Sequence, residues 1–461
     1  MATDGLASGS RLRAYRDWYA LEQTEVAGRL ADLGEQATGR RPGVTNEMVS
    51  RWERNVSRPS AYYRRLLRKL YEVGDAHLGF RPPLPGEIVI HPWDRLEETH
   101  PAAASWTMGG TARALRAAVE GAAMDRRAFL AAAGLGATGI SRDWLLAPGL
   151  TSAASTSGRA LPPETVDQLE TITGQLRRMD DQLGGGDLHP VIRQHLIFTV
   201  SLISDRRYHD PTGRRLHTIA AELARLAGWA SFDAGRHGAA QRYYAAALHA
   251  AHTAGDRALG ANVLGFASCQ AKDLGQTGDA ITLADAAVSG YPGRSPRVAA
   301  ILHLRLAEAH ATAGNQRECR TAIDTAFTRL ADPRPGGEPA WSYWINPAQA
   351  HAQAGYCHLT LGDQRAAQAH LCAALDLQDP ADSREGALRA ILLASSYARQ
   401  PQPDVEQAAA HASSAVTALS GPVASTRCVG HLTRLTASLR PYRRQPAVRD
   451  LLDQAAPLLT R

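Results

Sequence analysis

The sequence predicts an all-α protein. Alanine and arginine are abundant, whereas aromatic residues make up only 6% of the chain. Apolar residues recur at helical spacing almost everywhere after residue 160, and the alternating β-branched runs typical of strands are hard to find. At 461 residues the chain also exceeds the size at which one hydrophobic core keeps growing. We therefore expect helices arranged in at least two domains.

Cysteine usage and the lack of long apolar runs indicate the compartment. No run reaches the roughly 18 to 20 apolar residues that a membrane-spanning helix needs, and the first residues lack the apolar segment of a secretory signal. The five cysteines are odd in number and lack the paired spacing of a zinc or redox motif, which fits a reducing compartment. We expect a soluble, cytoplasmic protein. The cysteines are Cys269, Cys319, Cys357, Cys372 and Cys428.

Positive charge is concentrated in one segment. The whole chain carries a formal charge of +6, which permits nucleic-acid binding but is too small to indicate it. Residues 40–69 contain nine basic residues and two acids, so this segment alone exceeds the excess of the whole chain. The basic residues are Arg40, Arg41, Arg51, Arg54, Arg58, Arg64, Arg65, Arg68 and Lys69, and the acids are Glu47 and Glu53.

Residues 10–80 are predicted to form a compact unit of five helices. Capping residues and apolar positions at spacings of three and four mark where the helices begin and which side of each is buried. The expected helices are residues 10–19, a second from Gln23, a third over 46–53 capped by Thr45, a fourth from Ser60 and a short fifth that ends near residues 78–80.

The third of these helices has one apolar side and one polar side. Met48, Val49 and Trp52 form the apolar stripe. Small, polar and cationic residues occupy the other side, near the N-terminal end of the helix. Such residues suit the edges of base pairs in the major groove, which an α-helix can fill. The outward residues are Asn46, Glu47, Ser50 and Arg51, and Asn55 follows as a left-handed residue that ends the helix.

Three short motifs in this region carry a family resemblance: EQTEVA at residues 22–27, VSRWER at 49–54 and RPS at 58–60. Together they resemble the lambda-repressor-like (XRE) helix-turn-helix family over about residues 10–80. The resemblance implies that Gln23 binds a phosphate of DNA. The other expected DNA contacts are Arg40, Arg41, Thr45, Asn46, Glu47, Ser50, Arg51, Arg54 and Arg58.

Two features depart from the family pattern. The turn before the third helix is stretched over residues 34–42, and Asn55 stands where a glycine is usual. The alternative interpretation of this region is a small helical bundle whose basic face is merely solvated, as charged runs usually are.

Residues 82–160 are expected to form a linker. Its early prolines forbid a continuous helix and favour an extended spacer. A docking helix is expected near residues 111–140. Residues 148–162, rich in Ser, Thr, Ala and Pro, are expected to form a second joint.

Part of this linker also resembles a twin-arginine export signal. Arg126 and Arg127 are followed by small apolar residues up to Ile140. Export signals act at an N-terminus, whereas this run follows a predicted domain, and its apolar part is too short to span a bilayer. We therefore interpret it as part of the docking helix. The export alternative requires translation from Met124.

The C-terminal part repeats with a period near forty residues. A small residue stands five positions after each anchoring glycine, and an alanine stands twelve positions after it. The glycine lets the chain turn between two helices, and the small residues let neighbouring helices approach closely. We therefore expect stacked helical hairpins, none of which buries its apolar face alone. The anchors are Gly235, Gly275, Gly314 and Gly362.

Residues 361–375 (LGDQRAAQAHLCAAL) are similar to the tetratricopeptide family, and the resemblance covers about residues 215–420. It implies an α-solenoid with a concave groove that binds peptides or protein segments. An insertion lengthens one repeat and supplies the expected partner-binding lip. Its residues are Trp341, Tyr343, Trp344 and Asn346. The alternative is an array that serves only as a scaffold or dimer surface.

Few residues suggest catalysis or metal binding. The spacing of the histidines and cysteines between residues 351 and 372 brings at most two ligands onto one helical face. The sequence contains no phosphate-binding glycine loop with lysine, no nucleophile elbow and no paired zinc-binding spacing. We expect neither an enzyme nor a bound metal or cofactor. The residues considered were His351, Cys357, His358, His370 and Cys372.

These features together predict a sequence-specific transcription regulator that binds double-stranded DNA. Its parts are a helix-turn-helix domain at residues 1–81, a linker at 82–160 and a helical-repeat domain at 161–461. The last of these senses a peptide or protein partner, mediates dimerisation, or does both. The resemblance implies a homodimeric regulator of actinobacterial type. The alternative is a protein-interaction scaffold whose helix-turn-helix fold does not bind DNA.

Overall fold

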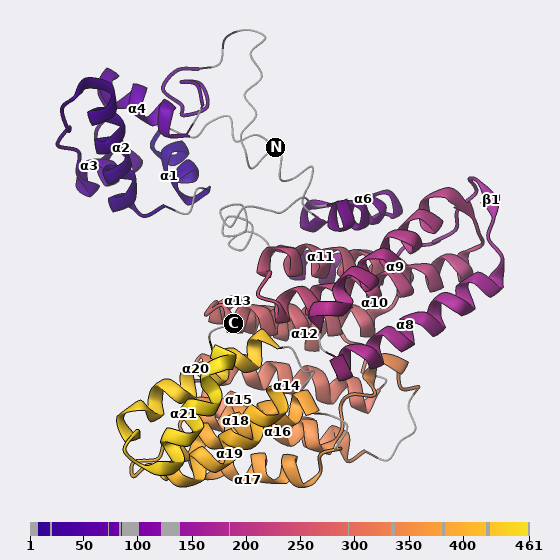
Figure 1. The fold of residues 1–461 in the computed structure, drawn as a ribbon. Coiled ribbons are helices and arrows are strands. Elements are labelled where there is room, and N and C mark those ends of the chain that lie inside the picture. The colour runs from indigo at the N-terminus through magenta and orange to yellow at the C-terminus, as the bar shows by residue number, and fades with distance from the viewer. Residues whose placement is uncertain are drawn as a thin grey trace. The chain divides into compact units, whose positions relative to one another are not determined.

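The computed structural model confirms the all-α prediction. The regular secondary structure of its described residues is helical apart from two strands of two residues each and one isolated bridge. Those up to Ala103 belong to one compact unit and those from Ala104 onward to a second; Figure 1 shows the helices of each. The structure describes residues 8–18, 21–71, 73–82, 84, 101–120, 139–183, 185–293, 295–332, 337–379, 383–420 and 425–459.

The helices of the first unit surround one hydrophobic core. Trp52 packs its ring against Tyr63, with centroids 5.2 Å apart. The apolar positions that helical spacing predicts to face inward are buried, among them Leu12, Val26, Leu30, Val49, Trp52, Leu66 and Leu67. The helices described in this unit are α1 (Ser8–Trp18), α2 (Gln23–Thr38), α3 (Asn46–Glu53) and α4 (Ala61–Tyr71), together with a 3-10 turn, η1 (Pro101–Ala103).

Two boundaries in the first unit differ from the sequence-based expectation. Helix α2 continues to Thr38, because the residues just before Thr38 are good helix formers. Gly39, with a φ of 72°, ends the helix. The irregular turn before α3 is therefore shorter than the predicted 34–42. Residues 74–80, where a short fifth helix was expected to end, form hydrogen-bonded turns instead, because glycines near both ends favour turns.

The second unit is a row of helical hairpins in which each hairpin packs against the next (Figure 1). The first helices of the hairpins contact one another in order, from α8 to α20. The pairs are α8 (Pro163–Leu183) with α9 (Gly185–Asp205), α10 (Asp210–Asp233) with α11 (His237–Ala254), α12 (Arg257–Asp273) with α13 (Thr277–Gly290), α14 (Pro296–Thr312) with α15 (Gln316–Leu330), α16 (Pro347–Thr360) with α17 (Gln364–Asp376), α18 (Ser383–Ala398) with α19 (Val405–Leu419), and α20 (Thr426–Leu439) with α21 (Pro446–Leu459). Two 3-10 turns, η2 (Ala340–Ser342) and η3 (Arg440–Tyr442), precede α16 and follow α20.

The four anchor glycines end the first helix of their hairpins in the same way. Each has a φ between 73° and 82°. Its N–H bonds to the carbonyl three residues back, and the N–H of the next residue bonds to the carbonyl five residues back. This Schellman motif needs a left-handed residue, a conformation that glycine adopts without strain. The small residues five and twelve positions after each anchor have no exposed surface, as the repeat pattern predicts.

Part of the predicted linker packs onto the second unit. Helix α6 (Met108–Glu120) lies against α9 and α11 (Figure 1), near the position expected for a docking helix. Further along, Trp144 is fully buried, and the guanidinium of Arg257 lies 3.7 Å from the centre of its ring. Residues 125–138, which contain the twin-arginine-like run, lie outside the described residues.

Residues 148–162, predicted as a joint, are hydrogen-bonded to the second unit. The Ala153 N–H donates to Oδ1 of Asp210 at 2.6 Å. Strand β1 (Arg159–Ala160) pairs in parallel with β2 (Arg206–Arg207). The polar composition of this segment favours a joint, but contacts with residues about fifty positions away hold it against α10.

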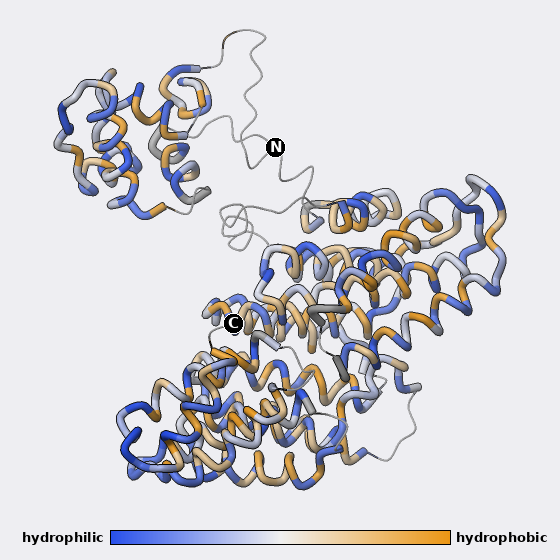
Figure 2. The backbone as a smooth tube through the Cα atoms, viewed as in Figure 1, coloured by the Kyte–Doolittle hydropathy of each residue, from blue (hydrophilic) through white to orange (hydrophobic). Residues whose placement is uncertain are grey.

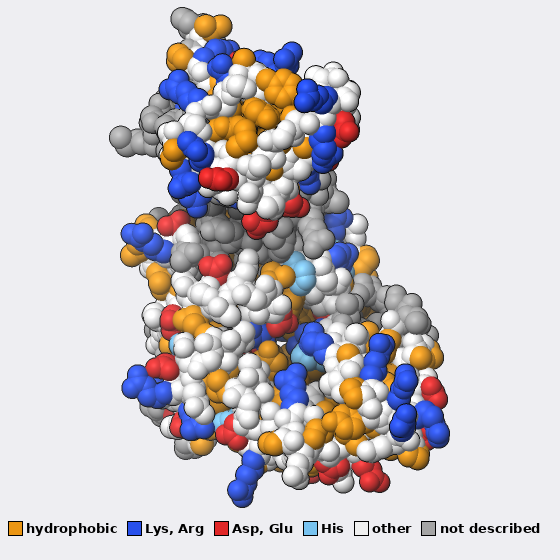
Figure 3. All heavy atoms as spheres, turned by 90° about the vertical axis from the view of Figure 1, so that its left-hand side faces the viewer, with side chains coloured by type: hydrophobic (Ala, Val, Ile, Leu, Met, Phe, Trp, Pro, Cys, Tyr) orange, Lys and Arg blue, Asp and Glu red, His pale blue; other side chains and the backbone are white. Residues whose placement is uncertain are grey.

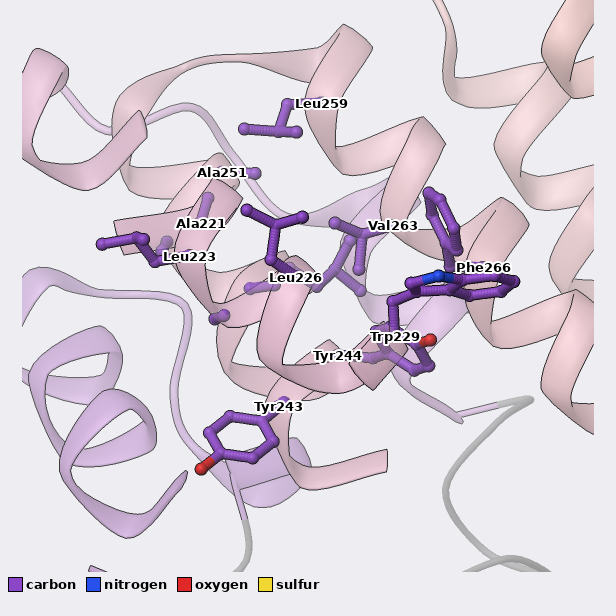
Figure 4. Close-up of a cluster of buried hydrophobic side chains, with 14 of the residues drawn as sticks. Ala221, Leu223, Leu226, Trp229, Tyr243, Tyr244, Ala251, Leu259, Val263 and Phe266 are labelled. Carbon is purple, nitrogen blue, oxygen red and sulfur yellow. The ribbon is translucent and has the colours of Figure 1, made fainter. Parts of the chain in front are cut away.

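Apolar residues follow the facing sides of the helices in both units (Figure 2). In the second unit the largest core passes through α10, α11 and α12, where the rings of Trp229 and Phe266 lie 5.3 Å apart (Figure 4). Among the described helices, none is both long enough and apolar enough to cross a bilayer.

Candidate functional site

Helix α3 presents a polar face on the first unit. Thr45 caps the helix, because its Oγ1 accepts the N–H of Met48 at 3.3 Å. Val49 is buried on the opposite side. The structure thus directs the polar side chains to solvent, as the helical period predicts. Asn46, Glu47 and Arg51 are exposed, and Ser50 is partly buried.

A buried carboxylate joins α3 to the two helices before it. Glu53 is 7% exposed. It accepts hydrogen bonds from Arg16 Nε at 2.6 Å and from Gln23 Nε2 at 2.8 Å. Glu53 is one of the two acids in the basic segment, but the structure places it inside the unit. Gln23, expected to bind a phosphate, gives one amide hydrogen to this carboxylate instead.

The arginines expected to contact DNA have different surroundings. Arg40, Arg54 and Arg58 are exposed. Arg41 forms ion pairs with two acids of α2, Asp32 at 2.7 Å and Glu35 at 2.9 Å. Acids of the same unit therefore compensate its charge. Figure 3 shows Lys and Arg side chains around an apolar patch on the first unit.

The end of α3 has the geometry that the sequence predicts. Asn55 has a φ of 57° and is the one non-glycine residue with positive φ in the described part of the chain. Its N–H bonds to the Trp52 carbonyl at 3.1 Å, and the Val56 N–H bonds to the Arg51 carbonyl at 2.9 Å. Asparagine tolerates this left-handed position, so the missing glycine leaves the helix end intact.

A cavity of about 410 Å³ lies in the second unit. The first helices of the hairpins, from α8 to α20, line it together with η2. All four residues predicted to form the partner-binding lip border this cavity: Trp341, Tyr343, Trp344 and Asn346. Trp341 is buried and Tyr343 is 39% exposed, while Asn346 caps α16 by accepting the Gln349 N–H at 2.8 Å.

The charged lining of this cavity was not predicted from the sequence. The lining cations come from six helices that are far apart in the sequence. One signal in the sequence could have indicated this lining: an arginine at a position where the helical period predicts a buried residue. Arg225, between Leu223 and Leu226, is such an arginine. The cations are Arg177, Arg225, Lys272, Arg305, Arg384, Arg389 and Arg427, and the acids are Asp180, Asp181, Asp273, Glu308, Asp379 and Glu385.

Glu308 is the centre of one buried network in the cavity wall. It accepts hydrogen bonds from Lys272 Nζ at 3.1 Å, from Arg305 Nη1 at 3.2 Å and from Gln353 Nε2 at 2.8 Å. Burial alone would raise the pKa of Glu308, but Lys272 and Arg305 outweigh burial and lower it to about 2. The carboxylate is therefore ionised and fully engaged within the wall.

Other contacts join distant helices around the cavity. The Tyr343 hydroxyl donates to Asp181 of α8, and an Arg384 nitrogen of α18 lies 4.0 Å from Oδ2 of Asp180. Burial raises the pKa of Asp180 to about 6, although Arg384 acts in the opposite direction. These contacts link the first hairpin to elements more than 150 residues later and narrow the space between them.

Histidines on α16 and α17 form a separate cluster. Nδ1 of His351 and Nδ1 of His370 lie 2.9 Å apart, and the ring of His358 stacks on that of His370. Burial lowers the pKa of His370 to about 4, helped by the two neighbouring rings. Within the described ranges, no three His, Cys, Asp or Glu side chains are arranged to hold a metal ion.

No protein-family model matches the chain, and no curated protein matches it. The function is therefore inferred from the residues of this chain and from their geometry.

Proposed function

We propose that the chain is a sequence-specific DNA-binding transcription regulator. In this proposal the N-terminal unit is a lambda-repressor-like helix-turn-helix domain, and α3 is the helix that enters the major groove. The second unit is a tetratricopeptide-like solenoid that senses a peptide or protein partner, mediates dimerisation, or does both.

The exposed side of α3 carries this proposal. Asn46, Ser50 and Arg51 lie on one side of a capped helix whose other side is anchored in the core. Amide, hydroxyl and guanidinium groups match the donors and acceptors that base pairs present in the major groove. Exposed arginines beside the helix, such as Arg54 and Arg58, would contact phosphates and fix its orientation.

One further feature supports a sensing role for the second unit. The cavity of the second unit contains several aromatic rings and is of the size that ligand sites have. A dimer would place two α3 helices on successive turns of the duplex, which is how helix-turn-helix proteins read paired half-sites.

Replacing Ser50 and Arg51 together by alanine tests the proposal. The wild-type chain first selects its preferred duplexes from a random-sequence library. Fluorescence anisotropy then measures the affinity of each variant for one selected duplex. Since each lost base contact is worth about 1–3 kcal/mol, we expect the double variant to bind at least about tenfold more weakly.

The control for this experiment is Arg317→Ala on α15. Its side chain is 90% exposed, so the variant removes the same charge from the second unit without disturbing packing. Affinity should stay at the wild-type value in the control. Equal affinity in the double variant would contradict the proposed role of α3.

A protein-interaction scaffold is the second candidate. It is favoured by two predicted DNA contacts that pair with acids of the first unit, Gln23 with Glu53 and Arg41 with acids of α2. On that interpretation the library selection enriches no sequence, and neither variant changes DNA binding.

A further inference from the structure

Arg225 is a buried cation without a hydrogen-bonded partner among the described residues. It lies on α10, lines the cavity and is 6% exposed. In the described part of the chain its Nε has no acceptor, and no carboxylate lies within ion-pair distance. Its close contact is the ring of Phe266, 4.9 Å from Cζ. An unpaired buried guanidinium is unfavourable, so a group that satisfies it would bind strongly.

Arg384 lines the same cavity, and it too has N–H groups without an acceptor among the described residues. It is 5% exposed, and its Nε and Nη1 have no acceptor among the described residues. The carboxylate oxygens beside it are those of Glu385 at 3.7 Å and Asp180 at 4.0 Å. These distances allow electrostatic attraction but are too long for hydrogen bonds. The guanidinium can therefore still donate to another acceptor.

Two other acids of the wall already have hydrogen-bond partners. Glu308 accepts from Lys272, Arg305 and Gln353, and Asp181 accepts from Tyr343. Satisfying Arg225 and Arg384 from these acids would break bonds elsewhere. An acceptor supplied from outside the chain would cost no such bond.

The size and walls of the cavity indicate a compact ligand. Its volume of about 410 Å³ falls in the range of roughly 300–1,000 Å³ typical of small-molecule sites. The aromatic wall includes Trp229, Phe266 and Trp344. An extended peptide running through the unit would have to displace the contacts of α8 with Tyr343 and Arg384.

We propose that this cavity binds a small organic anion whose carboxylate or phosphate oxygens accept hydrogen bonds from Arg225 and Arg384. The apolar part of the anion packs against the aromatic wall. A guanidinium offers paired N–H groups that match the two oxygens of either oxyanion. The inference gives the sensing unit a small anion as its ligand in place of a peptide, and otherwise rests on the proposed function.

Calorimetric titration of the full chain tests the ligand class. The probes are benzoate for carboxylates, phenyl phosphate for phosphates and benzyl alcohol as the neutral control. We expect at least one anion to bind and benzyl alcohol not to bind. The anion that binds more tightly identifies the oxyanion. No binding of either anion would overturn the inference.

Arg225→Met tests the site. Methionine retains apolar bulk but removes the charge, so the affinity for the anion should fall at least about tenfold, as expected for a lost charge-assisted hydrogen bond. Without ligand, the melting temperature of the variant should stay the same or rise, because an unpaired buried charge is gone. Wild-type affinity in this variant would overturn the inference.

A second buried arginine provides the matched control. Arg242 on α11 is 7% exposed and has two nitrogens without acceptors, but it lies outside the cavity lining. Arg242→Met should leave the affinity for the anion unchanged. DNA binding by ligand-free Arg225→Met should also be unchanged. Failure of anion binding with intact DNA binding would therefore refute this inference alone, whereas failure of DNA selection with intact anion binding would refute the regulator.

Discussion

At the scale of single residues, Glu53 shows how a buried carboxylate organises a small domain. It belongs to α3, yet its hydrogen bonds reach Arg16 of α1 and Gln23 of α2. A carboxylate removed from water is tolerated only with partners of this kind. Since Glu53 faces inward, Glu47 is the one acid of residues 40–69 that remains on the outward side of α3.

Glu53→Ala should destabilise the first unit by about 3 kcal/mol or more, because Arg16, whose side chain is only 14% exposed, loses the carboxylate that lies 2.6 Å from its Nε. Hydrogen exchange of the amides in residues 46–53 measures this loss locally. Glu47→Ala is the control, since Glu47 is exposed on the same helix, and it should change stability by no more than about 0.5 kcal/mol. Equal exchange in both variants would contradict the role assigned to Glu53.

Asp180 is a second residue whose surroundings set its charge. Burial raises its pKa to about 6, above the usual value for aspartate. The folded state therefore holds a proton between about pH 4 and pH 6 that the unfolded state has lost, so the contribution of Asp180 to the free energy of unfolding falls as the pH rises through this window. The charged groups that act on it are Arg384, Asp181, Asp233 and Arg225.

Protonation of Asp180 makes the cavity one charge more positive, so benzoate should bind about tenfold more tightly near pH 5.5 than near pH 7.5. Titration calorimetry at the two pH values measures the difference. Asp180→Asn should bind benzoate at both pH values about as tightly as the wild-type chain does at the lower one. A variant that kept the full pH dependence would show that another group is responsible.

At the scale of elements, the second unit repeats one local solution. The first helix of four hairpins ends in the same pair of backbone hydrogen bonds at a left-handed glycine. The small residues that follow are fully buried, so the second helix of each hairpin approaches its neighbours closely. Each hairpin thus leaves apolar surface that only the next hairpin covers.

Gly275→Ala should lower the stability of the second unit by about 1–2 kcal/mol, the cost of a left-handed backbone for a residue with a Cβ. Thermal denaturation followed by far-UV circular dichroism measures the change. Gly278→Ala is the matched control, since Gly278 lies within α13 and its Cβ would meet no atom within 4 Å. That variant should be neutral or slightly stabilised. Equal melting temperatures in the two variants would contradict the role of the left-handed turn.

At the scale of the whole molecule, charge is distributed unevenly between the units. Basic residues gather in the segment from Arg40 to Lys69 of the first unit, whereas many cations of the second unit lie in its cavity wall beside acids. In the proposed function, the first unit therefore offers cations to DNA, and the second offers them to a ligand small enough to enter.

The affinity for a selected duplex should fall steeply with salt. In a plot of log affinity against log salt concentration, each phosphate that the chain neutralises should contribute about −0.9 to the slope. Anisotropy titrations between about 50 and 200 mM salt measure this slope. Arg58→Ala should reduce the slope by about one unit if Arg58 contacts a phosphate, whereas Arg317→Ala should leave it unchanged. A slope near zero in the wild-type chain would contradict phosphate binding by the basic segment.

Features within one or two helical turns could be predicted from the sequence. The cap at Thr45, the left-handed residue at Asn55 and the glycines that end the hairpin helices were predicted correctly, because neighbouring residues determine local backbone geometry. The short fifth helix was predicted wrongly, since glycines near both ends of residues 74–80 favour turns. The polar composition of residues 148–162 suggested a joint, but hydrogen bonds to distant residues hold the segment in place.

The sequence by itself determined the helical class, the forty-residue period and the outward side of α3, since these depend on spacing along one helix or across one turn. Only the tertiary structure decided that Glu53 meets Arg16, that Tyr343 reaches Asp181, and that Arg225 and Arg384 line one cavity. The physical reason is that the partner of a buried charge is chosen by which helices pack together, and that choice leaves no mark on the residues immediately before and after the charge.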